Sequence, residues 1–110
     1  MKTHHPILVL SITAAAALAQ RRFVGLDGDV CGAGEKALGV AEFNADAGDQ
    51  ASVNVNGLIL VEAGGAIAAG AEVESNASGQ AMTLSAGASN GYALDAATTS
   101  GDVIRVVRGI

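Results

Sequence analysis

The first candidate for chemistry in this sequence is the loop around its single cysteine. The segment Cys31-Gly32-Ala33-Gly34-Glu35-Lys36 invites comparison with a phosphate-binding loop. Such a loop needs Gly-Lys-Ser/Thr at the start of a helix, so that main-chain N–H groups and the lysine converge on phosphate. Here Glu35 stands before Lys36 and would repel a phosphate. We therefore interpret the segment as an ordinary loop.

The thiol of Cys31 is also a poor candidate for a nucleophile. A catalytic thiol needs a neighbouring base, and the only histidines are His4 and His5, near the N-terminus. Two adjacent histidines point in different directions and no third ligand follows them, so we expect no metal site. One cysteine cannot form an internal disulfide or a cysteine-based zinc site. We expect Cys31 to be a small buried thiol.

Two pairs of aspartates, Asp27 with Asp29 and Asp46 with Asp49, each enclose a glycine. Paired carboxylates can bind calcium or act as acid and base, but neither pair continues into a ligand loop. Aspartate beside glycine is typical of turns. Because histidine is absent after residue 5, no Ser-His-Asp set can form. We expect no catalytic residues, no cofactor and no small-molecule substrate, and therefore no enzyme.

Composition narrows the class of protein further. The 110 residues carry a net charge of −5 and suit a single domain. With only six basic residues, the chain is a poor candidate for neutralising many phosphates, so we expect no nucleic-acid partner. No apolar run reaches the length of about 18 residues that a transmembrane helix needs, so we expect no membrane partner. Aromatic residues make up 3% of the chain, so the core must consist of small and β-branched side chains.

Short apolar segments separated by Gly, Asn, Asp and Ser predict an all-β fold, a small single-domain β-barrel or sandwich. The expected strands after residue 20 are Phe23–Leu26, Leu38–Phe43, Ser52–Glu62, Ala71–Ser75, Ala81–Ser85, Gly91–Asp95 and Val103–Arg108.

The clearest of these strands is Ser52–Glu62. Its valine and isoleucine residues lie at odd positions and its asparagines at even positions, which predicts one buried face. Gly57 interrupts this alternation and suggests a bulge or a close approach of another backbone. Farther along, Asn76-Ala77-Ser78-Gly79 has the composition of a hairpin turn. The same residues match a glycosylation sequon, but we interpret them as a turn.

Two parts of the chain repeat the same order of features, a strand, a loop, a Gly-Asp turn and a second strand. The first runs from Gly39-Val40-Ala41 through Gly48-Asp49 to Val53, and the second from Gly91-Tyr92-Ala93 through Gly101-Asp102 to Val106. This repetition predicts two similar hairpin units in one domain.

Residues 1–20 allow two interpretations. A short basic start, an apolar stretch and Ala17-Leu18-Ala19 match a secretory signal peptide. Enrichment in Ile and Val after Pro6 instead predicts a β segment over Ile7–Thr13. The alanine-rich run that follows would be a helical turn, which helix propensity favours, or a packed extended segment. An ordered apolar terminus must pack on its own domain or on a neighbour, so we divide the chain into an extended N-terminal arm, 1–20, and a β domain, 21–110.

Basic residues are concentrated at the two ends of the chain. Residues 23–104 hold all eleven acidic residues and only one basic residue, Lys36. This distribution is either ordinary solvation or a sign that the basic ends contact an acidic neighbour. The candidate contacts to another subunit or to a larger assembly are Ile7, Leu8, Val9, Leu10, Ile12, Arg21, Arg22, Arg105 and Arg108.

The order of several short segments is distinctive. These segments are Arg22–Gly28 after the alanine-rich run, Ala37–Ala41, Gly57–Gly64, Ala66–Val73 and Gly91–Ala97, followed by Gly101-Asp102 and a valine-rich last strand. This order resembles the small capsid decoration (cement) proteins of tailed bacteriophages over roughly residues 7–110.

The resemblance implies a β domain that is made in the host cytoplasm and binds the outer surface of the phage head. It further implies a homotrimer at three-fold and quasi-three-fold positions that contacts the major capsid protein and stabilises the shell. A competing hypothesis is a secreted or periplasmic β-domain with a binding or adhesion role, whose residues 1–19 are a signal peptide. A ligand-binding barrel is a third, but it would need a convergent polar site, and the chain has no His or Trp after residue 5 to build one.

Overall fold

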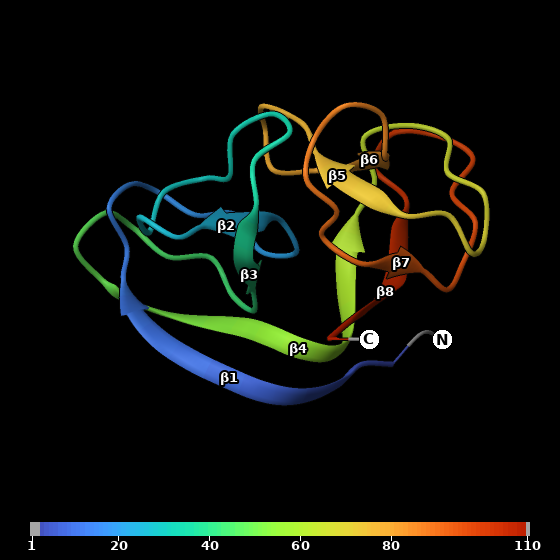
Figure 1. The fold of residues 1–110 in the computed structure, drawn as a ribbon. Coiled ribbons are helices and arrows are strands. Elements are labelled where there is room, and N and C mark those ends of the chain that lie inside the picture. Colours follow the sequence, from blue (N-terminus) through green and yellow to red (C-terminus); the bar gives the residue numbers. More distant parts are fainter. Residues whose placement is uncertain (1–2, 110) are drawn as a thin grey trace.

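The computed structural model describes residues 3–109 and shows an all-β domain without helices in that range (Figure 1), as the sequence predicts. The strands are β1 (His5–Thr13), β2 (Phe23–Gly25), β3 (Ala37–Ala41), β4 (Gln50–Glu62), β5 (Val73–Ser75), β6 (Ala81–Thr83), β7 (Tyr92–Ala93) and β8 (Val103–Arg108).

The long strand β4 is the centre of a curled sheet in the shape of a half-barrel. β1 pairs antiparallel along one edge of β4, from His5 opposite Leu58 to Thr13 opposite Gln50. β3 and β8 pair with successive parts of its other edge. β2 extends the sheet beyond β3, and β7 extends it beyond β8, while β5 and β6 form a separate two-stranded hairpin.

The sheet is built from two halves that repeat the same pairings. In the first half Ala41 lies opposite Val53 between β3 and β4, and in the second half Ala93 lies opposite Val106 between β7 and β8. The prediction of two similar hairpin units is confirmed. Figure 1 shows β2 and β3 on one side of the molecule and β5 to β8 on the other, with β4 running through both.

The loops between these strands repeat as well. Leu18 and Ala45 exchange two main-chain hydrogen bonds in the first half, and Ile67 and Ala97 do the same in the second. The N-terminal part of β4 therefore serves as the last strand of the first half, and its C-terminal part as the first strand of the second. The repetition makes β4 a strand that both halves share.

Small and β-branched side chains fill the core, in two clusters. The larger cluster lies mainly in the second half and includes Phe23, Val40, Ile59, Val61, Ile67, Val73, Ile104 and Val106. The smaller belongs to the first half and consists of Ala14, Leu18, Val24, Ala41, Ala51 and Val53, with Ile12 and four other partly buried side chains against it. Because Ala14 and Leu18 are buried, the residues before β2 contribute to the core.

Gly57 lies where the main chain of β1 passes close to β4. Its φ of +108° is one that L residues rarely adopt, and a Cβ there would lie 2.5 Å from the main-chain oxygen of His5. The pairing of β1 shifts register beside this point, between Pro6 and Val9. The predicted close backbone approach is confirmed, and it explains why glycine occupies this position.

The prediction of a helical turn after β1, which helix propensity favours, is wrong. The run from Ala14 to Ala19 is not helical, because its main chain bonds to another loop instead of to itself. The Ala14 N–H donates to Asp49, and Leu18 exchanges bonds with Ala45. Those long-range bonds and the burial of two of its side chains outweigh the helix propensity of alanine.

The hairpin turn predicted between β5 and β6 is confirmed. Asn76 accepts hydrogen bonds from the N–H groups of Ser78 and Gln80 with its side-chain oxygen, both at 2.9 Å. Gly79 adopts a φ of +77°, which glycine tolerates without strain.

Candidate functional site

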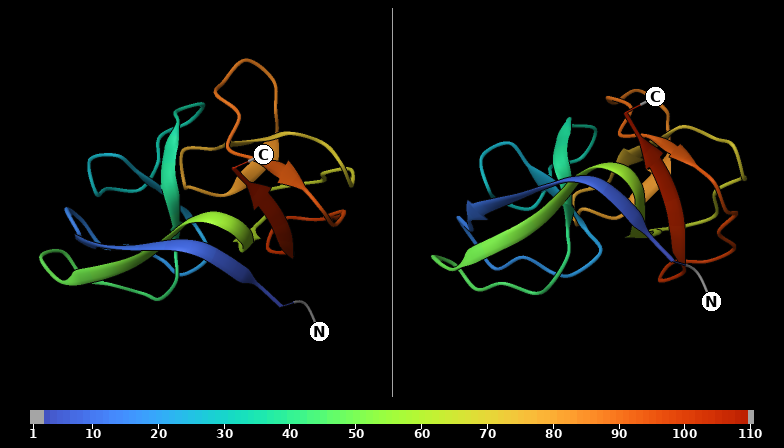
Figure 2. Two further views of the ribbon diagram at one scale, coloured as in Figure 1. Left: turned by 60° about the horizontal axis from the view of Figure 1, so that its bottom comes forward. Right: turned by 90° about the horizontal axis from the view of Figure 1, so that it is seen from below.

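β1 presents a free edge to solvent. Among the described residues, β4 is its strand partner on one side, and no strand pairs with the other side (Figures 1 and 2). The side chain of Ile7 is 85% exposed, and those of Leu8, Val9 and Leu10 are 41%, 45% and 37% exposed. Four of the predicted contact residues therefore lie together on this strand.

Ile12 has a different environment from the other apolar residues of β1. It is half-buried and packs against the smaller core cluster. The structure thus places Ile12 mainly in the core of its own chain, while residues 7–10 remain accessible. Whether these residues contact another subunit stays a prediction.

The sequence of β1 offers little protection against pairing with another strand. Natural edge strands commonly carry charged residues, proline or bulges, which discourage the addition of a further strand. The nine residues of β1 contain no Lys, Arg, Asp or Glu. Pro6 and the two register shifts lie between Pro6 and Val9, so the strand is regular from Val9 to Thr13. An uncharged apolar edge of this length suits the addition of a strand from another chain.

Two of the predicted contact arginines are held by carboxylates of the same chain. Arg22 lies 2.9 Å from the Glu62 carboxylate. Arg105 makes a two-pronged contact with Asp95, whose oxygens accept from Nε at 2.9 Å and from Nη2 at 2.8 Å. The hydrogen bond to Asp95 is the main reason that the pKa of Arg105 is raised.

The other two predicted arginines differ sharply from each other. Arg21 is exposed and adopts a φ of +66°. Arg108 is 9% exposed and donates to the main-chain oxygens of Ala37 at 2.9 Å and Leu38 at 3.0 Å. Burial lowers the pKa of Arg108. The structure therefore does not gather the four arginines into one basic patch.

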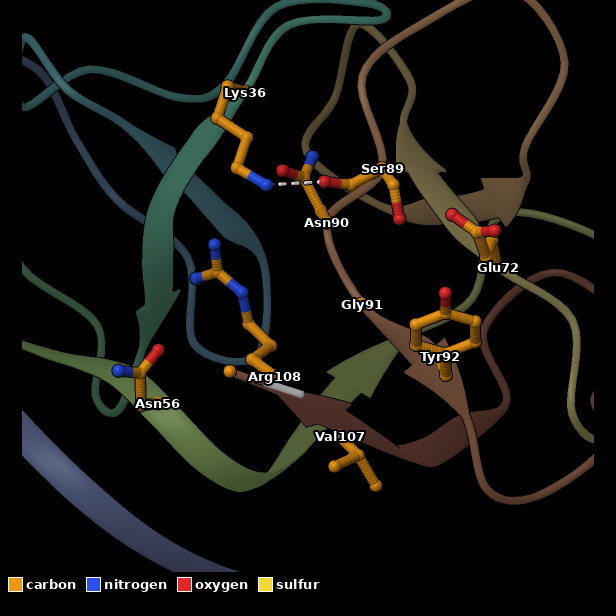
Figure 3. Close-up of a pocket in the computed structure, with 10 residues that line it drawn as sticks. Lys36, Asn56, Glu72, Ser89, Asn90, Gly91, Tyr92, Val107 and Arg108 are labelled. Atoms are coloured by element: carbon orange, nitrogen blue, oxygen red, sulfur yellow. Dashed lines mark hydrogen bonds between the residues drawn. The ribbon is translucent and has the colours of Figure 1, made fainter.

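A polar pocket of about 430 Å³ lies between the two halves of the sheet (Figure 3). Lys36 and Arg108 occupy one wall, and Glu72 and Tyr92 the facing wall. The remaining lining residues are Asn56, Ser89, Asn90, Gly91, Val107 and Gly109.

Asn90 fixes the inner wall of this pocket. Its side chain is 1% exposed, accepts from the Ala37 N–H at 2.9 Å and donates to the Glu35 oxygen at 3.0 Å. Lys36 reaches across to the main-chain oxygen of Ser89 at 2.6 Å. These bonds join the segment before β3 to the segment before β7, so the pocket is formed where the halves meet.

Sequence reasoning did not predict this pocket. Its residues come from both halves and lie far apart in the sequence. One signal was present: Arg108 follows Ile104 and Val106 at the alternate positions of the last strand that point to the core. A charged residue at a buried position of an alternating strand indicates a partner or a special role.

The residues considered for chemistry have structural contacts. Burial is the largest cause that raises the pKa of the Cys31 thiol, and its sulfur contacts the Glu35 oxygen at 3.4 Å. The Asp27 carboxylate accepts from the Asp29 N–H at 3.1 Å, as in a turn. Within residues 3–109 there is no group of three or more His, Cys, Asp or Glu side chains placed to hold a metal ion. That part of the chain also has no helix long and apolar enough to cross a membrane.

Comparison with known proteins decides the class. A profile of the phage cement protein family matches residues 1–108. The chain belongs to the phage cement protein family. It is thus a structural protein of a phage capsid, as the resemblance at the sequence level indicates.

A solved structure shares the fold of this cement protein. It is the N base of the head fiber protein gp8.5 of bacteriophage phi29, with a TM-score of 0.73 and 22% sequence identity. The similarity covers 91% of this chain and 92% of that one. At this identity the comparison establishes the all-β fold. No curated protein sequence matches the chain.

Proposed function

We propose that this cement protein decorates the outer surface of the phage head and stabilises the shell by binding the major capsid protein. It does so as a homotrimer at three-fold and quasi-three-fold positions, after synthesis in the host cytoplasm. The family match over residues 1–108 is the observation that carries this proposal.

The free edge of β1 is the contact surface that best suits this role. Strand addition supplies main-chain hydrogen bonds and a fixed register without requiring charged side chains. The exposed apolar side chains at residues 7–10 would be removed from water in the same step. Many identical positions on a shell also allow weak single contacts of an oligomer to add up to stable binding.

The arginines at the ends of the chain contribute less to this surface than their number suggests. Arg22 and Arg105 are already paired within the chain, and Arg108 is buried. Of the predicted basic contacts, Arg21 is the exposed one, so it is the arginine we expect to meet an acidic neighbour.

Two matched variants test the role of the β1 edge. Ile7 is 85% exposed and Leu26, which follows β2, is 73% exposed, so lysine should be tolerated at either position. We expect both I7K and L26K to keep the unfolding free energy of the unmodified chain within about 0.5 kcal/mol. Only I7K places a charge on the free edge.

The assay is density-gradient separation of phage particles incubated with each protein, followed by quantification of the bound chain. We expect the unmodified chain and L26K to band with DNA-filled heads and I7K to bind at least tenfold less. Equal binding by I7K and L26K would exclude the β1 edge as the contact. No banding by any of the three would reject the decoration function itself.

Two further readouts belong to the same experiment. Light scattering of the purified chain measures its mass, and a monomer both in solution and on particles would reject the trimer. Intact mass of the chain from a producing culture gives its first residue. A start at Gln20 in material that does not band would favour the secreted β-domain.

A further inference from the structure

The pocket between the two halves holds two cations that have no carboxylate partner in residues 3–109. The ion pairs of this region are Arg22 with Glu62 and Arg105 with Asp95. Lys36 and Arg108 instead donate to main-chain oxygens. These neutral acceptors hold both side chains in place without an ion pair.

Arg108 is well prepared to receive an anion. Both of its Nη atoms are fixed by Leu38 and Ala37, so the guanidinium loses little further freedom when a ligand binds. Burial removes water from the Arg108 guanidinium, which disfavours its charged form and lowers its pKa. An anion bound in the pocket would offset this loss of solvation. A carboxylate binds guanidinium through strong charge-assisted hydrogen bonds.

The rest of the lining suits a polypeptide better than a free ion. The volume of about 430 Å³ is more than a single carboxylate needs and lies in the range of ordinary ligand sites. Asn56 and Ser89 add neutral polar side chains to the lining, and the Tyr92 ring gives an apolar wall. Glu72 on the facing wall, in a chain of net charge −5, disfavours a multiply charged phosphate.

We propose that this pocket binds an acidic side chain, Asp or Glu, presented by a segment of a partner polypeptide. Lys36 and Arg108 hold the carboxylate, and Tyr92 with Asn56 contacts the neighbouring peptide. The site lies apart from the free edge of β1, so the proposal does not depend on strand addition.

The probe is the blocked peptide acetyl-Ala-Glu-Ala-amide. It is titrated into the ¹⁵N-labelled full chain at pH 7, and binding is measured by NMR. The main-chain N–H signals of Gly91 and Gly109 report on the pocket. We expect a saturable shift with a Kd in the millimolar range, as for a small exposed contact. The matched peptide acetyl-Ala-Gln-Ala-amide, which lacks the charge, should give no saturable shift.

Three variants separate the pocket from the overall charge. Lys36 is exposed, so K36Q should fold normally and bind the glutamate peptide about two- to fivefold more weakly. S100D lowers the net charge by the same amount at an exposed turn residue outside the pocket and should leave the Kd unchanged. E72Q removes the opposing carboxylate and should bind two- to threefold more tightly.

Several results would overturn the proposal. One is the absence of a saturable shift with up to about 10 mM glutamate peptide, and another is equal binding of the glutamine peptide. Equal weakening by S100D and K36Q would mean that the net charge, not this pocket, governs binding. Sodium acetate binding as tightly as the peptide would point to a free carboxylate, and tighter binding of inorganic phosphate would point to a different class of anion.

Discussion

Replacement of Gly57 by alanine tests whether β1 packs against its own β4. Gly57 has a φ of +108°, and a Cβ there would lie 2.5 Å from the His5 oxygen and 2.7 Å from the Ile7 nitrogen. Gly70 provides the matched control, because it has a φ of +87° but nothing within 4 Å of a Cβ. The two substitutions therefore share backbone strain and differ in the contact with β1.

The expected magnitudes follow from these contacts. A non-glycine residue at positive φ lowers the free energy of unfolding by about 1–2 kcal/mol. Replacing a flexible glycine also reduces the entropy of the unfolded chain, which raises the free energy of unfolding by about 0.4–1 kcal/mol. G70A should therefore destabilise by between about 0 and 1.6 kcal/mol. In G57A the added methyl group meets main-chain atoms of β1 that must shift, which adds about 1–3 kcal/mol. We expect G57A to be the less stable variant by that difference.

The assay is urea unfolding followed by far-UV circular dichroism, with thermal unfolding as a second measurement. For 110 residues, each kcal/mol corresponds to about 4 °C in Tm, so G57A should unfold about 4–12 °C below G70A. Hydrogen exchange at residues 8–10 should also accelerate in G57A, because β1 is displaced. Equal midpoints for the two variants would refute the placement of β1 against Gly57.

Other residues give shorter tests. I59A empties a fully buried position and should cost about 2–5 kcal/mol, whereas L60A, on the half-buried side of the same strand, should cost less, both measured by urea unfolding. Burial raises the pKa of Cys31, so its contribution to stability is complete below the ordinary thiol pKa of about 8.5 and is lost as the pH rises through the raised value. The unmodified chain should therefore lose Tm between pH 8 and 10 more steeply than C31A, and parallel profiles would contradict this. N76A removes the acceptor for two turn N–H groups and should cost about 1–2 kcal/mol, with the dichroism spectrum unchanged.

Local signals in the sequence predicted most of the strands and turns. The alternation predicted in Ser52–Glu62 holds at Val53, Ile59 and Val61, which are buried, but it fails in between, because Asn54 is buried and Val55 is only half-buried. The Asn76 turn and the repeated Gly-Asp pattern also depend on neighbours a few residues apart, and both are present in the structure. The predicted ends of the strands were less accurate. The expected strand Gly91–Asp95, for example, is reduced to Tyr92–Ala93, because the chain beyond it turns to follow Ile67 and Asp102.

The features that sequence could not predict depend on residues far apart in the chain. The pairing of β1 with β4 joins residues 37 to 53 positions apart, and an apolar segment alone does not reveal which edge it will meet. The pocket depends on Arg108 reaching the oxygens of Ala37 and Leu38. Likewise, the charge pattern gave no indication that Arg22 and Arg105 find Glu62 and Asp95 in the folded chain.

The strand shared by the two halves has a consequence for how the chain folds. Neither half can complete its pairing until β4 is in place, since Thr13 meets Gln50 at one end of β4 and Glu62 meets Val103 at the other. The halves are therefore not independent folding units, and unfolding should be a single cooperative transition. Because these pairings close long loops, the refolding rate should fall in the slow range typical of all-β domains, with β4 ordered in the transition state.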